Sequence, residues 1–164
     1  MEEAIESYKQ AIRIDPDDAD AHLNLGITYG LLGMYKEAIE ATKQAIRINP
    51  DNAAAHLELG LALIGAGMYQ EAIEATKHAI RIDPNNADVH LNLGYAYSCL
   101  GMYKEAIEAY KQTLRIDPNF AMAHYYLGLV YDSLNDKGSA LEQYKILKSL
   151  DSERANELFK LINK

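Results

Sequence analysis

Cysteine, tryptophan and proline are scarce in this sequence: its 164 residues include one cysteine, no tryptophan and four prolines. A lone cysteine, Cys99, excludes an internal disulfide and fits a reducing compartment. Four prolines and ten glycines are too few for a linker or a low-complexity tail. The longest apolar run, 59–69, falls well short of the roughly 20 residues that a membrane-spanning helix needs. We therefore expect a globular chain without a membrane partner.

Basic residues are also in deficit, since 16 Lys and Arg face 24 Asp and Glu for a net charge of −8. Binding to nucleic acid or to an anionic membrane surface needs clustered cations. We therefore expect neither partner, whereas a protein with some basic character is better tolerated. The chain opens Met1-Glu2-Glu3, acidic where a secretory signal is basic, and no apolar stretch follows. Cytoplasm is the default expectation for its location.

An internal repeat dominates the sequence. Its clearest members are His22, His56, His90 and His124, which recur every 34 residues. The same spacing holds for leucine (Leu25, Leu59, Leu93, Leu127), glycine (Gly26, Gly60, Gly94, Gly128), alanine (Ala38, Ala72, Ala106, Ala140) and proline (Pro50, Pro84, Pro118). We predict full repeats at 19–52, 53–86, 87–120 and 121–154, after a half repeat at 1–18 and before a capping helix at 155–164.

Each repeat reads as two helices, expected at 20–32 and 36–48 in the first full unit because apolar residues recur at spacings of three and four. Gly33, Gly67 and Gly101 stand where a left-handed helix end is favoured. Asp18, Asn52 and Asn86 are placed to cap the following helix. Helices this short are marginal alone and must pack on their neighbours, with Gly26 and Ala38 at the point of closest approach. In the capping helix we expect Leu158, Phe159 and Ile162 to face inward.

The repeated pattern resembles the tetratricopeptide repeat (TPR). In the first full unit it is His22-x-x-Leu25-Gly26-x-x-Tyr29, followed by Ala38 and Pro50; the third unit is closer still, with Tyr97, Ala106, Tyr110 and Pro118. The resemblance covers essentially the whole chain. It implies an all-α, right-handed superhelical solenoid of antiparallel helix pairs, forming a single array over residues 1–164.

No residue pattern predicts catalysis, a metal or another cofactor. The recurring histidines lie on successive helices whose axes are ~8–10 Å apart, whereas zinc–nitrogen bonds are about 2 Å. We therefore expect the histidines to be framework residues and expect no metal site. Cys99 has no second cysteine or paired histidine beside it in the sequence, and neither a nucleophile triad nor a phosphate-binding loop is present. The chain is predicted to be a non-catalytic scaffold that binds another protein.

A second stripe on the first helix of each repeat points away from the packing residues. In TPR proteins this stripe lines the concave groove, and the resemblance implies the same use here. The predicted peptide-binding groove residues are Leu23, Asn24, Ile27, Leu57, Glu58, Leu61, Ile64, Leu91, Asn92, Tyr95, Tyr125, Tyr126 and Leu129. The stripe is apolar with scattered amide and acidic groups and no cation, which suits an apolar peptide or helix segment with some basic character. A purely structural role in completing helix packing is the alternative.

One known TPR mode is not expected. The clamp that holds the carboxylate tail of heat-shock chaperones needs cations, yet the matching positions hold Leu23, Ile27, Glu58, Asp88 and Asn92. A carboxylate would meet acidic groups there, so we predict that such chaperone tails do not bind.

Two other functions remain open at this stage. The first helix has no partner helix within its half repeat, so the chain could self-associate or complete a longer array through Ile5, Tyr8 and Ile12. Alternatively, the chain is the accessory TPR region of a larger enzyme.

Overall fold

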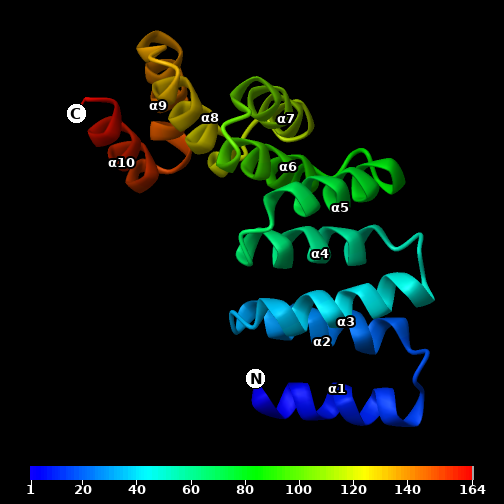
Figure 1. Ribbon diagram of the computed structural model, residues 1–164. Helices are drawn as coiled ribbons and strands as arrows, with labels where there is room; N and C mark the ends of the chain where they lie inside the picture. Colours follow the sequence, from blue (N-terminus) through cyan, green and yellow to red (C-terminus); the bar gives the residue numbers. More distant parts are fainter. Residues whose placement is uncertain (164) are drawn as a thin grey trace. The chain divides into compact units, whose positions relative to one another are not determined.

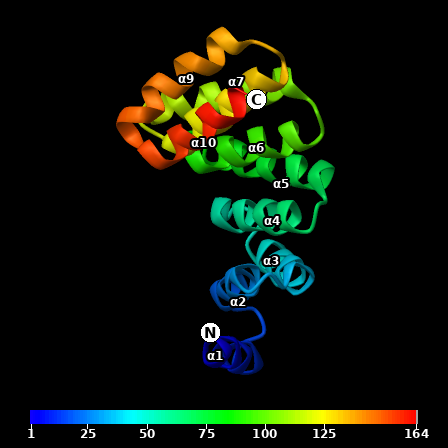
Figure 2. The same ribbon diagram turned by 90° about the vertical axis from the view of Figure 1, so that its left-hand side faces the viewer.

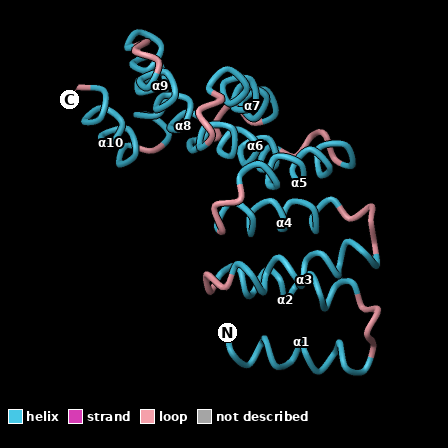
Figure 3. Tube along the Cα trace, in the orientation of Figure 1, coloured by secondary structure: helices cyan, strands magenta, loops and turns pink. Residues whose placement is uncertain are grey.

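The computed structural model describes residues 1–163, and in this range it contains ten α-helices and no strand (Figures 1 and 3). The helices are α1 (Glu2–Ile14), α2 (Ala19–Leu31), α3 (Tyr35–Ile48), α4 (Ala53–Gly65), α5 (Tyr69–Ile82), α6 (Ala87–Cys99), α7 (Tyr103–Ile116), α8 (Ala121–Ser133), α9 (Lys137–Leu150) and α10 (Ser152–Ile162). In the first full repeat, α2 and α3 begin and end within one residue of the predicted helices. Residue 164, the last of the predicted capping segment, lies outside the described residues.

The predicted helix ends are confirmed. Gly33, Gly67 and Gly101 have φ angles of 73°, 75° and 72°, in the left-handed region that favours glycine. The fourth repeat makes the same turn with Asn135, whose φ is 59°. At the start of α2, the Asp18 carboxylate accepts a hydrogen bond from the Ala21 backbone N–H at 2.9 Å. Local residue chemistry alone therefore sets most helix boundaries.

Close contact between the two helices of a pair also follows the prediction. A Cβ atom added at Gly26 would lie 2.5 Å from Thr42 Cγ2 and 3.3 Å from the Ala38 carbonyl oxygen. Any side chain at position 26 would push α2 away from α3. Thr42 stands where TPR units often carry an aromatic residue; it is buried, and its hydroxyl donates to the Ala38 carbonyl oxygen at 2.8 Å.

Residues 1–84 and 85–164 form two compact units, here called the N-terminal and C-terminal units. In the N-terminal unit, each helix from α1 to α5 packs on the next (Figures 1 and 2), and α2 also contacts α4. Its core contains Leu25, Tyr29 and several alanines that allow close helix packing. In the C-terminal unit, α6 pairs with α7 and α8 with α9, around a core that includes Tyr110 and Leu127.

The capping helix α10 packs on both α9 and α8 in the C-terminal unit (Figure 1). Asp151 caps it, so it begins three residues before the predicted start. Leu158 and Ile162 face inward as predicted, but the inward placement of Phe159 was wrong. One residue beyond Leu158, Phe159 turns to the edge of the helix, where it is 44% exposed and its ring lies 5.0 Å from that of Tyr144.

Within residues 1–163, every helix is too short or too polar to cross the hydrocarbon core of a bilayer.

Candidate partner-binding site

Four predicted groove residues meet in one cavity of the N-terminal unit, here called the N-terminal inner cavity. It has a volume of about 410 Å³ and lies between α2 and α4, the first helices of two successive repeats. Its lining residues are Gly26, Ile27, Gly30 and Leu31 from α2, Tyr35 from the start of α3, and Glu58, Leu61, Ala62, Ile64 and Gly65 from α4. The walls are apolar apart from one carboxylate and one phenol.

Glu58 contributes the one carboxylate of this cavity. The residue is half-buried and forms no hydrogen bond or ion pair with residues 1–163, and its carboxylate oxygens keep contact with solvent. No lysine or arginine lines the cavity. Burial raises the pKa of Glu58 above its ordinary value. A carboxylate in this position is available to a cation from outside the chain.

The end wall of the cavity depends on a glycine. A Cβ atom at Gly65 would lie 2.6 Å from Cδ1 of the Tyr35 ring, so only glycine lets the ring lie against the end of α4. Tyr35 is 37% exposed, and its ring is therefore accessible to a bound group.

The C-terminal unit contains a second cavity built from the same repeat positions, here called the C-terminal inner cavity. It has a volume of about 210 Å³ and lies between α6 and α8. It is lined by Tyr95, Ser98, Cys99, Tyr103, Tyr110, Tyr126, Leu129, Val130 and Ser133. Two repeat lengths separate Tyr95 from Ile27, Ser98 from Gly30, Tyr126 from Glu58 and Ser133 from Gly65. Larger side chains at these positions account for its smaller volume.

Tyrosine rings dominate this second cavity. The ring of Tyr126 lies 5.3 Å from Tyr95, 5.9 Å from Tyr110 and 5.6 Å from Tyr125. The hydroxyls of buried Tyr110 and Ser98 are 2.9 Å apart. Burial raises the pKa of Tyr110. For Tyr125, burial is the larger cause and a hydrogen bond with the Glu157 carboxylate the smaller one, and together they raise its pKa to about 12. The phenol of Tyr110, which lines the cavity, is therefore neutral at physiological pH. The exposed thiol of Cys99 lines it.

The remaining predicted residues, Tyr125 among them, lie outside the cavity walls. Asn24 is exposed, whereas Leu57, Leu91 and Asn92 are half-buried. Leu23 is 8% exposed and packs with Ala45 and Ala55, so it offers a partner little surface.

The residues predicted for self-association, Ile5, Tyr8 and Ile12, are half-buried rather than free. They pack against the core cluster that contains Leu25 and Tyr29.

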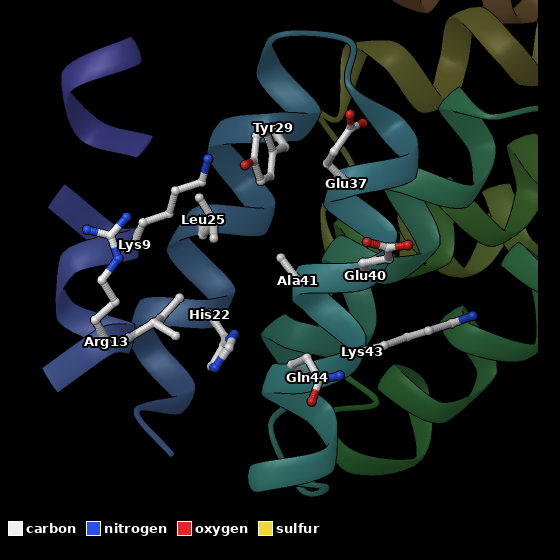
Figure 4. A pocket seen from close by; sticks show the side chains of 11 residues that line it. Lys9, Arg13, His22, Leu25, Tyr29, Glu37, Glu40, Ala41, Lys43 and Gln44 are labelled. Atoms are coloured by element: carbon white, nitrogen blue, oxygen red, sulfur yellow. The ribbon is translucent and has the colours of Figure 1, made fainter. Parts of the chain in front are cut away.

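The structure also contains an outer cavity that the sequence did not predict. About 730 Å³ in volume, it lies between α1 and α3 over α2 (Figure 4). Leu25, Tyr29 and Ala41 line it, with Lys9 and Glu40 among its charged residues. The Nζ atom of Lys9 lies 5.9 Å from the Tyr29 ring centroid, so the chain's own lysine already partners this aromatic wall.

An equivalent outer cavity of about 340 Å³ lies one repeat further along, between α3 and α5. His56 and His78 line it, with stacked rings 5.3 Å apart. Residues that line the outer cavities, such as Glu40 and Lys43, occupy a helix face that spacing alone identifies as solvated. The sequence signal that could have predicted the outer cavities was the set of apolar packing residues beneath that face.

The recurring histidines hold each first helix to the preceding turn, as framework residues would. Nε2 of His22, His56 and His124 lies 3.0, 2.9 and 2.9 Å from the carbonyl oxygen of Pro16, Pro50 and Pro118 respectively. In the described part of the chain, no group of three or more His, Cys, Asp or Glu side chains could hold a metal.

Comparison with known families agrees with this geometry. Family models described as TPR repeat match residues 1–33 and 63–101, and models described as tetratricopeptide repeat match 19–52, 87–120 and 41–74. The crystal structure of MamA is 32% identical, with a TM-score of 0.85, covering 93% of this chain and 89% of that one. The chain belongs to the tetratricopeptide repeat family. The predicted fold class is confirmed, and the TPR chain is a protein-interaction scaffold.

Two further structures resemble this TPR chain. YrrB, described as a TPR protein with an unusual peptide-binding site, is 25% identical with a TM-score of 0.82, covering 97% of this chain and 83% of that one. A MamA fragment from Desulfovibrio magneticus RS-1 is 24% identical with a TM-score of 0.86, covering 93% of this chain and 86% of that one, and it shows the fold alone. No curated protein matches the sequence.

Proposed function

We propose that this TPR chain binds extended or helical segments of a partner protein on the first-helix face of the repeats in each unit, with partner side chains entering the inner cavity of that unit. The observation that carries this proposal is the recurrence of an open, mostly apolar cavity at the same repeat positions in each unit. Open apolar cavities with a few polar groups are typical binding sites.

The polar groups beside the cavities suit a peptide. Exposed Asn24 and half-buried Asn92 each carry an amide that both donates and accepts hydrogen bonds. A partner backbone that loses water on binding needs such groups. YrrB, which has the same fold, binds a peptide at a site of its own, and this likeness supports the proposal.

The outer cavities and the N-terminal helix are weaker candidates. The Tyr29 wall is already partnered by Lys9, and Arg13 pairs with Glu6 at 3.6 Å. Self-association through Ile5 and Tyr8 would compete with their packing on the chain's own core.

We also propose that the chain acts without catalysis. The N-terminal inner cavity has one ionisable carboxylate and no base or nucleophile to work with it. The C-terminal inner cavity contains the thiol of Cys99, but no histidine lines the same cavity.

Cys99 provides a direct test because it is the single cysteine of the sequence and is exposed. Peptides would be selected from a random display library on the immobilised chain, and the alkylation rate of Cys99 measured with and without each peptide. Selected peptides should slow alkylation of Cys99. The matched control moves the thiol to the outer cavity in the double variant Cys99→Ser and Gln44→Cys, where the same peptides should leave the rate unchanged.

A second variant tests the N-terminal unit. Leu61→Arg, at a position 39% exposed on the inner face, should abolish binding of the selected peptides to the N-terminal unit, whereas Ile14→Arg, 78% exposed at the end of α1, should not. Protection of the outer thiol alone, or failure to select any peptide, would contradict the proposal.

A further inference from the structure

We propose that the N-terminal inner cavity is a specificity pocket for one lysine or arginine side chain of the partner, with Glu58 as the group that recognises its charge. This inference rests on the proposed function and assigns a chemical class of side chain to one of its two cavities.

Charge is the first argument. The carboxylate of Glu58 lies at a mostly apolar wall without a hydrogen-bonding or ionic partner among residues 1–163, and its oxygens keep contact with solvent. Partial burial disfavours the charged form and raises the pKa of Glu58. A cation supplied by a partner would remove this cost, and charge-assisted hydrogen bonds are among the stronger polar contacts.

Shape is the second argument. Lysine and arginine place a charge at the end of a long aliphatic stem, and such stems pack along apolar surfaces. Ile27, Leu61 and Ile64 provide that surface, and the volume of about 410 Å³ is enough for a long side chain. Tyr35 adds an accessible aromatic ring, which attracts a cation placed over its face.

The repeat-equivalent cavity provides the third argument, because it lacks the same features. Tyr126 occupies the position of Glu58, and Tyr95 occupies that of Ile27. Its volume is about 210 Å³, and no acidic residue lines it. A long cation would find less room and no counter-ion there, so only the N-terminal inner cavity is expected to select a basic side chain.

The test uses two probes that differ in charge but share a stem, N-acetyl-lysine methylamide and N-acetyl-norleucine methylamide. Each would be titrated into the whole chain while the methyl NMR signals of Ile27, Leu61 and Ile64 are followed, with Leu129 as the signal from the other cavity. A single side chain should bind with a dissociation constant on the order of millimolar. The lysine probe should shift the three N-terminal signals at lower concentration than the norleucine probe, and should leave Leu129 unmoved.

Glu58→Gln keeps the shape of the side chain and removes its charge. It should weaken binding of the lysine probe roughly tenfold or more while leaving norleucine binding unchanged. Glu71→Gln is the matched control, because Glu71 is an exposed carboxylate of the same unit that lines an outer cavity. In the unaltered chain, saturation with the lysine probe should also lower the pKa of Glu58 measured from its side-chain carboxyl signal. A purely structural glutamate would show no such change.

Equal binding of both probes, or unchanged lysine binding in Glu58→Gln, would overturn the specificity pocket and leave the proposed function intact. Absence of any shift with either probe would also overturn it. The proposed function fails on different results, namely when no peptide is selected or when the selected peptides leave Cys99 unprotected, so the two failures are distinguishable.

Discussion

The two inner cavities occupy the same repeat positions but have different chemistry. In the N-terminal unit the cavity is about 410 Å³ and contains one unpaired carboxylate; in the C-terminal unit it is about 210 Å³ and is lined mainly by tyrosines. The framework around both is nearly unchanged, with His, Leu, Gly and Ala at fixed positions. This comparison shows that the residues lining the inner cavities differ between repeats while the residues that hold the fold stay the same.

Replacing Tyr126 by glutamate, the residue at the equivalent position of the other cavity, should have the largest effect on stability. Tyr126→Glu places a carboxylate among the rings of Tyr95, Tyr110 and Tyr125 and should lower the free energy of unfolding by about 3 kcal/mol. Tyr126→Phe keeps the ring and should cost less than about 1 kcal/mol. Chemical denaturation followed by circular dichroism measures both. Equal stability of the two variants would show that the tyrosine cluster does not hold this cavity.

An alanine at equivalent positions should have opposite effects in the two units. Ser98→Ala leaves the buried Tyr110 hydroxyl without its partner and should destabilise the chain by about 1–2 kcal/mol. Gly30→Ala should stabilise it by about 0.5–1 kcal/mol, because a Cβ atom there meets nothing within 4 Å and α2 gains helix propensity. Thermal unfolding midpoints should therefore move in opposite directions. A shared direction would contradict the assigned contacts.

Adding a side chain at Gly65, in the end wall of the N-terminal inner cavity, should weaken binding while leaving stability almost unchanged. A Cβ atom at Gly65 would overlap the ring of Tyr35, an accessible side chain that can rotate away. Gly65→Ala should thus change the free energy of unfolding by less than about 1 kcal/mol, yet weaken the lysine probe several-fold by displacing the cavity wall. The matched change Ser133→Gly in the other cavity should leave lysine binding unaltered. NMR titration and thermal unfolding of the same samples measure both quantities.

The smallest expected effect is the pH dependence caused by Glu58. Its pKa is raised in the folded chain, so the folded state binds this proton more readily than the unfolded state. The resulting stability is fully present below the unfolded pKa and is lost as pH rises through the folded pKa. Glu58→Gln should therefore unfold at a higher temperature than the unaltered chain near pH 7, with the difference shrinking towards pH 4. A difference that grows on acidification would contradict the assignment.

Much of the fold could be predicted from the sequence because its determinants are local. Glycine at 33 and 67 allows left-handed helix ends, Asp18 caps α2, and the 34-residue spacing identifies the stacking partners. Phe159 was misplaced because one residue of helix turns the side chain about 100° away from the inward face that Leu158 and Ile162 share.

The inner cavities could be predicted only in part from the sequence. Spacing placed Ile27, Glu58 and Leu61 on one stripe, but cavity size depends on side-chain contacts such as that of Tyr35 with Gly65, which spacing does not reveal. The sequence did contain a signal for the difference between the cavities. Glu58 and Tyr126 occupy equivalent repeat positions on this face but differ in charge and size. Positions that vary between repeats within a constant framework therefore identify the residues that give the two cavities different chemistry.

The most direct test of the account is a crystal structure of the whole chain bound to the tightest peptide recovered by display selection. The account predicts a peptide on the first-helix face, with a lysine or arginine nitrogen within hydrogen-bonding distance of the Glu58 carboxylate and its stem against Ile27 and Leu61. A peptide seated instead in the outer cavity, against Leu25 and Tyr29 between α1 and α3, would contradict it.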